Sequence, residues 1–167
     1  MLSNFQIERI CRENKIRLNG VFSKDELKEI DPRDGNFVIN LQSSSQGNGT
    51  HWLTLIIQKH QAFFQDPYGA PPPIEIIKFV RRRKQVKQFG YNSWVIQDLK
   101  SCSCGWFAIA LLHFVKNNID NDLVKVCNKF INQFTDDTKE NEIILSDNIK
   151  ELKPNSLVET FLKRKTL

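Results

Sequence analysis

The sequence predicts an α+β fold in which a mostly antiparallel sheet packs around one central, buried helix. Residues 37–41 and 51–58 are rich in β-branched and aromatic residues and are bounded by turn signals, which is typical of strands. Residues 105–115 are apolar on every side, and a helix of that kind belongs at the centre of a domain. Apolar residues also recur at helical spacing from about residue 121, which predicts an amphipathic helix.

The remaining elements follow from caps, apolar spacing and turn residues. We expect helices at about residues 4–14, 74–89, 105–115 and 121–134 and after Pro154. Ser3 or Asn4 would cap the first helix, whose apolar face includes Phe5. We expect strands at residues 37–41, 51–58, 61–65 and 93–97. The second and third strands would form a hairpin that turns at residues 59–60 and follows a loop at 42–50.

Length and composition indicate one domain over residues 1–167. Hydrophobic residues make up 40% of the chain and aromatic residues 10%, which is enough for a core and excludes a disordered or fibrous protein. The longest apolar run, residues 106–115, is about half of a membrane span, and the first residues lack a signal-peptide pattern. We therefore expect a protein that is not secreted and contacts no membrane. The net charge of +5 permits an acidic partner without requiring one.

The four cysteines give no pattern of a metal site. Only Cys102 and Cys104 are close in sequence, and no second pair follows, as a structural zinc site would require. We expect four reduced thiols, most of them buried. Cys102 could form a regulatory disulfide or pack in the interior, and we favour packing. Cys104 is different because it directly precedes the apolar helix at 105–115.

Four polar residues stand at the ends of predicted elements, where a side chain is held in place and can still be reached. His51 begins a strand and Asp66 ends its hairpin partner. Gln97 ends another strand, and Cys104 precedes the central helix. An imidazolium and a helix N-terminus both favour the thiolate form of a cysteine, and a carboxylate orients the imidazole. With a turn at residues 59–60, we expect His51 to lie opposite Asp66 on the paired strand.

A thiolate that attacks a carbonyl also needs hydrogen-bond donors for the oxyanion. The backbone N–H groups of Cys104 and Gly105 would be free at the start of a helix, and the Gln97 amide could add a donor. Gly105 has no Cβ, so we expect a substrate backbone to approach it closely. Taken singly, each residue has an ordinary interpretation: a surface or core histidine, a turn-forming aspartate, a surface amide and a packing cysteine. Their combination favours catalysis.

The ordered set of motifs resembles one protease family. Gly49-Thr50-His51-Trp52, Asp66-Pro67-Tyr68-Gly69, Gln97 and Cys104-Gly105 are similar to the adenovirus-type maturation cysteine proteases, the adenain-like enzymes. Those enzymes share the chain order His, Asp or Glu, Gln, Cys, with Gln seven residues before Cys. The pieces at residues 20–27, 72–78 and 91–92 are similar to the proteases of Maverick/Polinton elements and virophages. The resemblance covers about residues 5–115.

This resemblance implies a papain-like core and a thiol endopeptidase that processes capsid and core precursors at small-residue, Gly-containing sites. It implies Cys104 as the nucleophile, His51 as the general base and acid, and Asp66 as the residue that orients His51. Gln97 would donate to the oxyanion. Two residues would border the substrate groove: Gly49 and Trp52.

The resemblance also implies where the protein acts and with what. The expected location is the virion and the interior of the infected host cell, with precursor polypeptides as substrates. The sequence requires no cofactor or metal. The adenoviral enzymes use DNA and a peptide as activators, so viral DNA or a peptide is kept as an untested activator, and a monomer is favoured.

Two alternatives share some of these features. Deconjugating proteases of the SUMO/ubiquitin-like type have the same His-Trp, Asp, Gln, Cys-Gly order, but they grip a folded modifier, for which this chain is short. The second is a non-enzymatic virion protein that binds nucleic acid. Its case rests on a basic cluster of five residues: Arg81, Arg82, Arg83, Lys84 and Lys87. Consecutive basic residues on a helix face several directions, which favours a solvated face over a binding stripe.

Overall fold

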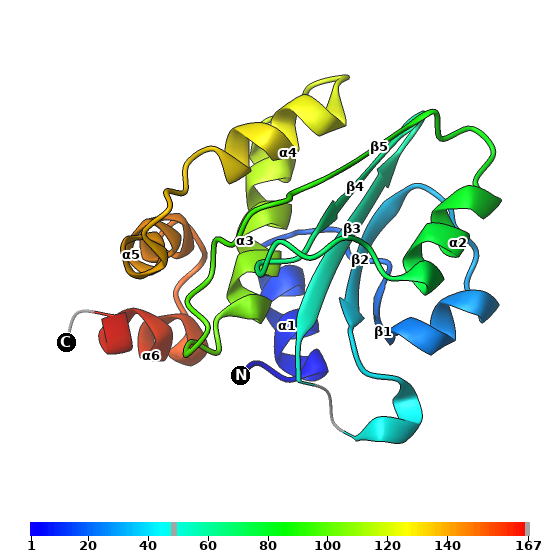
Figure 1. Cartoon of the computed structure of the whole chain (residues 1–167). Helices are drawn as coiled ribbons and strands as arrows, with labels where there is room; N and C mark the ends of the chain where they lie inside the picture. Colours follow the sequence, from blue (N-terminus) through cyan, green and yellow to red (C-terminus); the bar gives the residue numbers. More distant parts are fainter. Residues whose placement is uncertain (48–49, 166–167) are drawn as a thin grey trace.

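The computed structural model describes residues 1–47 and 50–165 and confirms the α+β fold (Figure 1). The elements are α1 (Asn4–Glu13), β1 (Gly20–Ser23), η1 (Lys24–Glu29), β2 (Gly35–Asn40), η2 (Ser44–Gln46), β3 (Trp52–Gln58), β4 (Gln61–Gln65), α2 (Ile74–Arg82), β5 (Gln88–Tyr91), α3 (Cys104–Asn117), α4 (Leu123–Ile131), α5 (Thr138–Ile149) and α6 (Ser156–Lys165). Within the described ranges, no helix has the length and hydropathy that crossing a bilayer requires.

The sheet is mixed, with the strand order β1-β2-β3-β4-β5. The two central pairings, β2 with β3 and β3 with β4, are antiparallel. The two edge pairings, β1 with β2 and β4 with β5, are parallel. Each parallel pair is joined by a helical crossover, η1 in the first case and α2 in the second, as parallel strands require. The prediction of a mostly antiparallel sheet therefore holds for its centre, while its edges are parallel.

Hydrophobic cores form on both faces of this sheet. Side chains alternate along β2, so that Val38 packs on the side of α1 and α3, whereas Phe37 and Ile39 pack on the side of α2 and η1. Helix α3 lies between the sheet and α5, and α4 packs beside α3 and against β4 (Figure 1). Its residues 104–112 are all buried, which confirms the predicted central helix.

The terminal helices agree with prediction only in part. Ser3 caps α1 through a capping box, and α6 follows Pro154 as expected. Phe5, however, is 75% exposed and lies off the buried face of α1. Helix α5 was not predicted, because three of its buried positions are polar: Asn141, Glu142 and Ser146.

Two predicted elements in the middle of the chain are wrong. The helix expected at residues 74–89 ends at Arg82, and residues 88–91 pair with β4 as the edge strand β5. Residues 93–97 form no strand. The N–H groups of Ile96 and Gln97 donate to the carbonyl of Pro67 at 2.9 and 3.1 Å, so this segment runs along the turn at residues 66–69.

Candidate active site

Two buried side chains meet at the open end of the β3–β4 hairpin, His51 just before β3 and Asp66 just after β4. His51 Nε2 lies 2.7 Å from Asp66 Oδ1, and the two residues are 6% and 4% exposed. The strand register differs from the prediction by two residues: Thr54 pairs with Gln65, so a continued ladder would place Tyr68 opposite His51. Asp66 still reaches the imidazole because it lies just beyond the end of β4.

The surroundings of His51 favour its charged form. Burial alone would lower the pKa of His51, but hydrogen bonds to Asp66 and Cys104, together with the negative charge of both groups, raise it to about 9. Since Asp66 occupies Nε2, the other ring nitrogen is left for the Cys104 thiol. At neutral pH the imidazole is therefore protonated and lies between a carboxylate and a sulfur.

Asp66 is itself fixed by residues to which the sequence analysis gave no role. The buried Asn92 accepts from the Asp66 N–H at 3.0 Å and donates to the Asp66 carbonyl at 2.6 Å. The backbone N–H of Tyr68 donates to Asp66 Oδ1 at 2.8 Å. Gly69 has a φ of +70°, and a Cβ there would lie 2.5 Å from the carbonyl carbon of Trp94, so only glycine fits the turn. Asn92 and the turn at residues 66–69 therefore form one brace around the carboxylate.

Cys104 is the first residue of α3 and is 2% exposed. The preceding Ser103 does not cap the helix with its side chain; its hydroxyl donates instead to Glu142 Oε2 of α5 at 2.8 Å. In the described part of the chain, no acceptor is recorded for the N–H groups of Cys104 and Gly105. These two N–H groups stay available to an oxyanion, as the sequence analysis expects.

Gly105 also has a role in packing. A Cβ at this position would lie 3.2 Å from Trp52 Cδ1 and 3.3 Å from the Cβ of Leu2. The missing side chain therefore lets Trp52 and the N-terminal segment pack against the helix. The approach of a substrate backbone to Gly105 stays a prediction.

The structure describes one of the two residues predicted to border the substrate groove. Gly49 lies outside the described residues. Trp52 is 4% exposed, donates its indole N–H to the Leu2 carbonyl at 2.8 Å, and borders a cavity of about 500 Å³ together with Phe22 and Asn40. A role for Trp52 in substrate binding stays a prediction.

Gln97 reaches the site from a loop and is fully buried. Its Nε2 donates to the Ser101 carbonyl at 2.9 Å and to the Tyr68 hydroxyl at 3.2 Å. Because a carbonyl can only accept, the nitrogen of the amide must face Ser101. Tyr68 in turn stacks on His51, with ring centroids 4.6 Å apart and planes 19° apart. Gln97 and His51 are thus linked through one tyrosine.

The five basic residues predicted to contact nucleic acid fall into two groups in the structure. Arg82 donates to the carbonyls of Leu27 and Ile30 at 2.6 and 2.8 Å, and Arg83 pairs with Asp34 at 2.7 Å. Both guanidinium groups therefore hold α2 against η1 and the start of β2. The other three residues, which have exposed charges, border a cavity of about 640 Å³: Arg81, Lys84 and Lys87.

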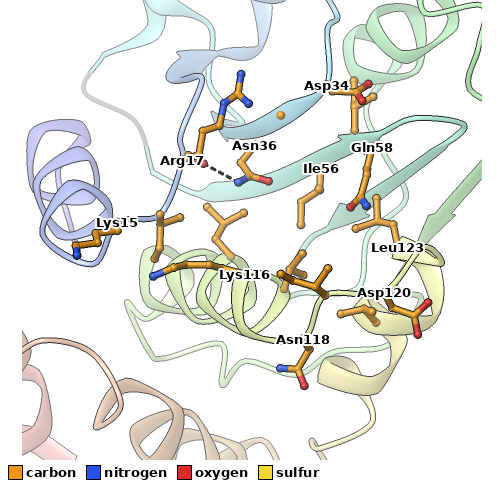
Figure 2. A pocket seen from close by; sticks show the side chains of 17 residues that line it. Lys15, Arg17, Asp34, Asn36, Ile56, Gln58, Lys116, Asn118, Asp120 and Leu123 are labelled. Atoms are coloured by element: carbon orange, nitrogen blue, oxygen red, sulfur yellow. Dashed lines mark hydrogen bonds between the residues drawn. The ribbon is translucent and has the colours of Figure 1, made fainter.

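Another pocket, of about 380 Å³, lies at the far end of α3, about 20 Å from Cys104 at the helical rise per residue. Its floor includes Ile56 and Leu123, and Lys116, Arg17 and Asp120 lie around it (Figure 2). Lys116 already donates to the carbonyl of Asn14, and Asp120 pairs with Lys125. Two of the charged groups are therefore already engaged within the protein.

The cysteines agree with the expectation except at one position. Cys11 and Cys127 are buried, and burial raises the pKa of both thiols, that of Cys11 to about 12. Cys102 is exposed, so its interpretation as a packing residue is wrong. Among residues 1–47 and 50–165, no group of three His, Cys, Asp or Glu side chains could hold a metal ion.

Comparison with solved structures shows the fold. The chain is similar to the pS273R protease of African swine fever virus with a TM-score of 0.60 and 16% identity, over 84% of this chain and 64% of that protease. It thus spans about 64% of the length of the viral enzyme. Weaker similarities are to AvrA bound to IP6 and CoA and to ChlaDub1 of Chlamydia trachomatis. Both have TM-scores of 0.48, with 17% and 16% identity, over 97% and 98% of this chain and 68% and 81% of those.

No family model and no curated protein matches the sequence. The structural similarity and the element order together show that the chain has the α+β fold of the papain-like cysteine proteases.

Proposed function

We propose that the protein is a cysteine endopeptidase whose nucleophile is Cys104. The observation that carries this proposal is the placement of a cysteine at the start of a buried helix beside the 2.7 Å pair of His51 and Asp66. A protonated imidazole next to a sulfur favours the thiolate, which is the nucleophilic form. The similarity to a viral protease at the level of the fold supports the same assignment.

The geometry suggests a role for each group along the reaction. The sulfur of Cys104 attacks the scissile carbonyl carbon, and the negative charge that forms on oxygen meets the N–H groups of Cys104 and Gly105. The C–N bond then breaks, and His51 gives its proton to the leaving amine. Water attacks the thioester carbon, and His51 takes the proton of that water. The C–S bond then breaks, which releases the acid product and restores the thiolate of Cys104 beside the protonated His51. Asp66 keeps the ring oriented throughout.

We further propose that the substrates are capsid and core precursors, cut at Gly-containing sites in the virion or at its assembly site in the host cell. Two observations support this finer proposal: the motif set around His51, Asp66 and Cys104, and the similarity of the fold to a viral protease. A role in virion maturation would require cleavage of extended, unfolded segments, because precursor processing sites lie in exposed chain.

The test is cleavage of a short-peptide library with Gly at varied positions, read by mass spectrometry. Cys104→Ala is the inactive control, and Cys102→Ser, which changes the exposed neighbouring thiol, is the matched control. We expect cleavage at Gly-containing sites by the wild type and by Cys102→Ser and none by Cys104→Ala. Cleavage by Cys104→Ala would contradict the assignment of the nucleophile.

The same experiment separates the maturation protease from a deconjugating protease. A second substrate set would consist of folded ubiquitin and SUMO, each with a C-terminal extension. Cleavage of short peptides favours maturation, because a deconjugating enzyme draws its affinity from the folded modifier. Cleavage of only the folded substrates would replace the maturation proposal and leave the cysteine protease in place.

We also propose viral DNA as a partner of the three exposed cations Arg81, Lys84 and Lys87. Neutralising three phosphates predicts a slope of about −3 for log K against log salt concentration on duplex DNA. Lys84→Gln should make the slope less steep by about one, whereas Lys150→Gln at the end of α5, which does not line this cavity, should leave it unchanged. A binding constant that does not depend on salt would remove this partner.

A further inference from the structure

Tyr68 touches two groups of the candidate site at once. Its ring stacks on His51, and its hydroxyl lies 3.2 Å from Gln97 Nε2. The backbone fixes this position, because the Tyr68 N–H donates to Asp66 Oδ1 at 2.8 Å and the Gly69 N–H donates to the Asp66 carbonyl at 2.8 Å. A side chain held between the base and the buried amide is well placed to meet a substrate.

Counting donors shows what the hydroxyl can do. The amide nitrogen of Gln97 carries two hydrogens, and one of them bonds to the Ser101 carbonyl. The second points to the oxygen of Tyr68, so that Gln97 has no further donor for an oxyanion. The phenol keeps its own hydrogen, and in the described part of the chain no acceptor is recorded for it.

The surroundings keep that hydrogen on the phenol. Partial burial raises the pKa of Tyr68, and the negative charges of Cys104, Cys102 and Asp66 raise it further. The ring that carries this hydroxyl stacks on His51, with centroids 4.6 Å apart. A neutral donor beside the proposed base, on a half-exposed side chain, is what a developing oxyanion requires.

We propose that the Tyr68 hydroxyl is a further catalytic group, which donates its hydrogen bond to the scissile carbonyl oxygen as charge develops there. Gln97 is then a positioning residue, because its amide N–H donates to the Tyr68 hydroxyl and orients it. No proton leaves the phenol, because the interaction is a hydrogen bond that strengthens with the charge. This proposal rests on the proposed cysteine protease activity.

The first test is Tyr68→Phe, which keeps the ring on His51 and removes only the hydroxyl. Loss of one oxyanion donor should lower kcat about 100-fold and leave KM nearly unchanged. Tyr91→Phe is the matched control, because Tyr91 is the other tyrosine of the chain and is 45% exposed. We expect this control to cleave at the wild-type rate.

A second measurement separates the effect of losing the hydroxyl from any effect of the ring on His51. Alkylation by iodoacetamide, followed against pH in a Cys102→Ser background, reports the reactivity of Cys104 without any oxyanion. We expect Tyr68→Phe to leave this profile unchanged and to weaken inhibition by a Gly-Gly aldehyde, whose adduct places an oxygen at the oxyanion position. If the wild type is active and Tyr68→Phe has the same kcat/KM, the proposal is refuted. An alkylation profile that shifts together with kcat would also refute it, because Tyr68 would then act through His51.

If the proposed protease function is wrong, the same experiments give a different set of results. A wild type that cleaves neither peptides nor folded substrates and does not bind the aldehyde would refute the protease assignment, and the role of Tyr68 with it. An active wild type that Tyr68→Phe leaves unchanged refutes the role of Tyr68 alone.

Discussion

Replacing Asp66 by asparagine removes one charge from the buried pair and keeps the size of the side chain. The two partners are 2.7 Å apart and at most 6% exposed, so little water screens them. Their interaction, with that of Cys104, outweighs burial and raises the pKa of His51 from 6.5 to about 9. At about 1.4 kcal/mol per pKa unit, this difference corresponds to about 3 kcal/mol of folding free energy.

The sign of the pH dependence follows from the direction of the shift. A histidine whose folded pKa is raised stabilises the folded state fully below its unfolded pKa, near 6.5, and loses that contribution as pH rises through about 9. The free energy of unfolding of the wild type should therefore fall between pH 6.5 and 9. In Asp66→Asn the hydrogen-bonding carboxylate is gone and burial dominates, so the pKa of His51 should drop and this fall should largely disappear.

Two measurements test this expectation. The chain has three histidines, so the ring C–H resonance of His51 can be assigned by its loss in His51→Gln and titrated by NMR. Urea unfolding at pH 6.5, 8 and 9 then gives the difference in stability between wild type and Asp66→Asn. Asp34→Asn is the control, because it removes a carboxylate from a partly exposed ion pair that contains no histidine. A His51 that titrates near 6.5 in the wild type, or a stability difference independent of pH, would refute the reasoning.

Three further expectations concern the frame of the site. Cys104→Ala should abolish turnover and change the free energy of unfolding by no more than about 1 kcal/mol, which activity assays and urea titration measure together. Gly69→Ala should cost about 2 kcal/mol or more, because φ is +70° and the new Cβ would meet the Trp94 carbonyl; a cost near zero in urea would contradict the clash. Ser103→Ala should cost about 1–3 kcal/mol, because the buried Glu142 loses a 2.8 Å hydrogen bond; thermal unfolding that matches wild type would show that this bond contributes nothing.

Much of the fold could be predicted because local signals and burial agree there. The capping box at Ser3 and the apolar stretch of α3 are complete within a few residues of sequence, and both elements form as expected. The hairpin also forms, since its turn at residues 59–60 separates two runs of strand-forming residues. Its register differs from the prediction by two residues, which places Tyr68 opposite His51, so sequence alone did not predict the contact between these two rings.

The elements that were predicted wrongly depend on distant partners. Apolar spacing alone does not reveal that residues 88–91 pair with β4, so the predicted helix at 74–89 extends too far. Residues 93–97 have strand-like side chains, but their N–H groups bond to Pro67 of a turn far away in sequence. Helix α5 hides its periodicity because polar residues occupy buried positions. In each case tertiary contacts override local preference.

The polar face of α5 also explains why the C-terminal third matters to the site. Serine at the end of a loop normally caps the helix that follows, and its oxygen then takes up one of the first N–H groups. Here Glu142 accepts the Ser103 hydroxyl, and the side-chain cap of α3 does not form. The N–H group of Gly105, which is at the N2 position that such a cap can take up, therefore stays open, and a residue 38 positions after the nucleophile favours this state. A strictly apolar α5 would have been easier to predict, but it would have offered Ser103 no acceptor in place of its own helix.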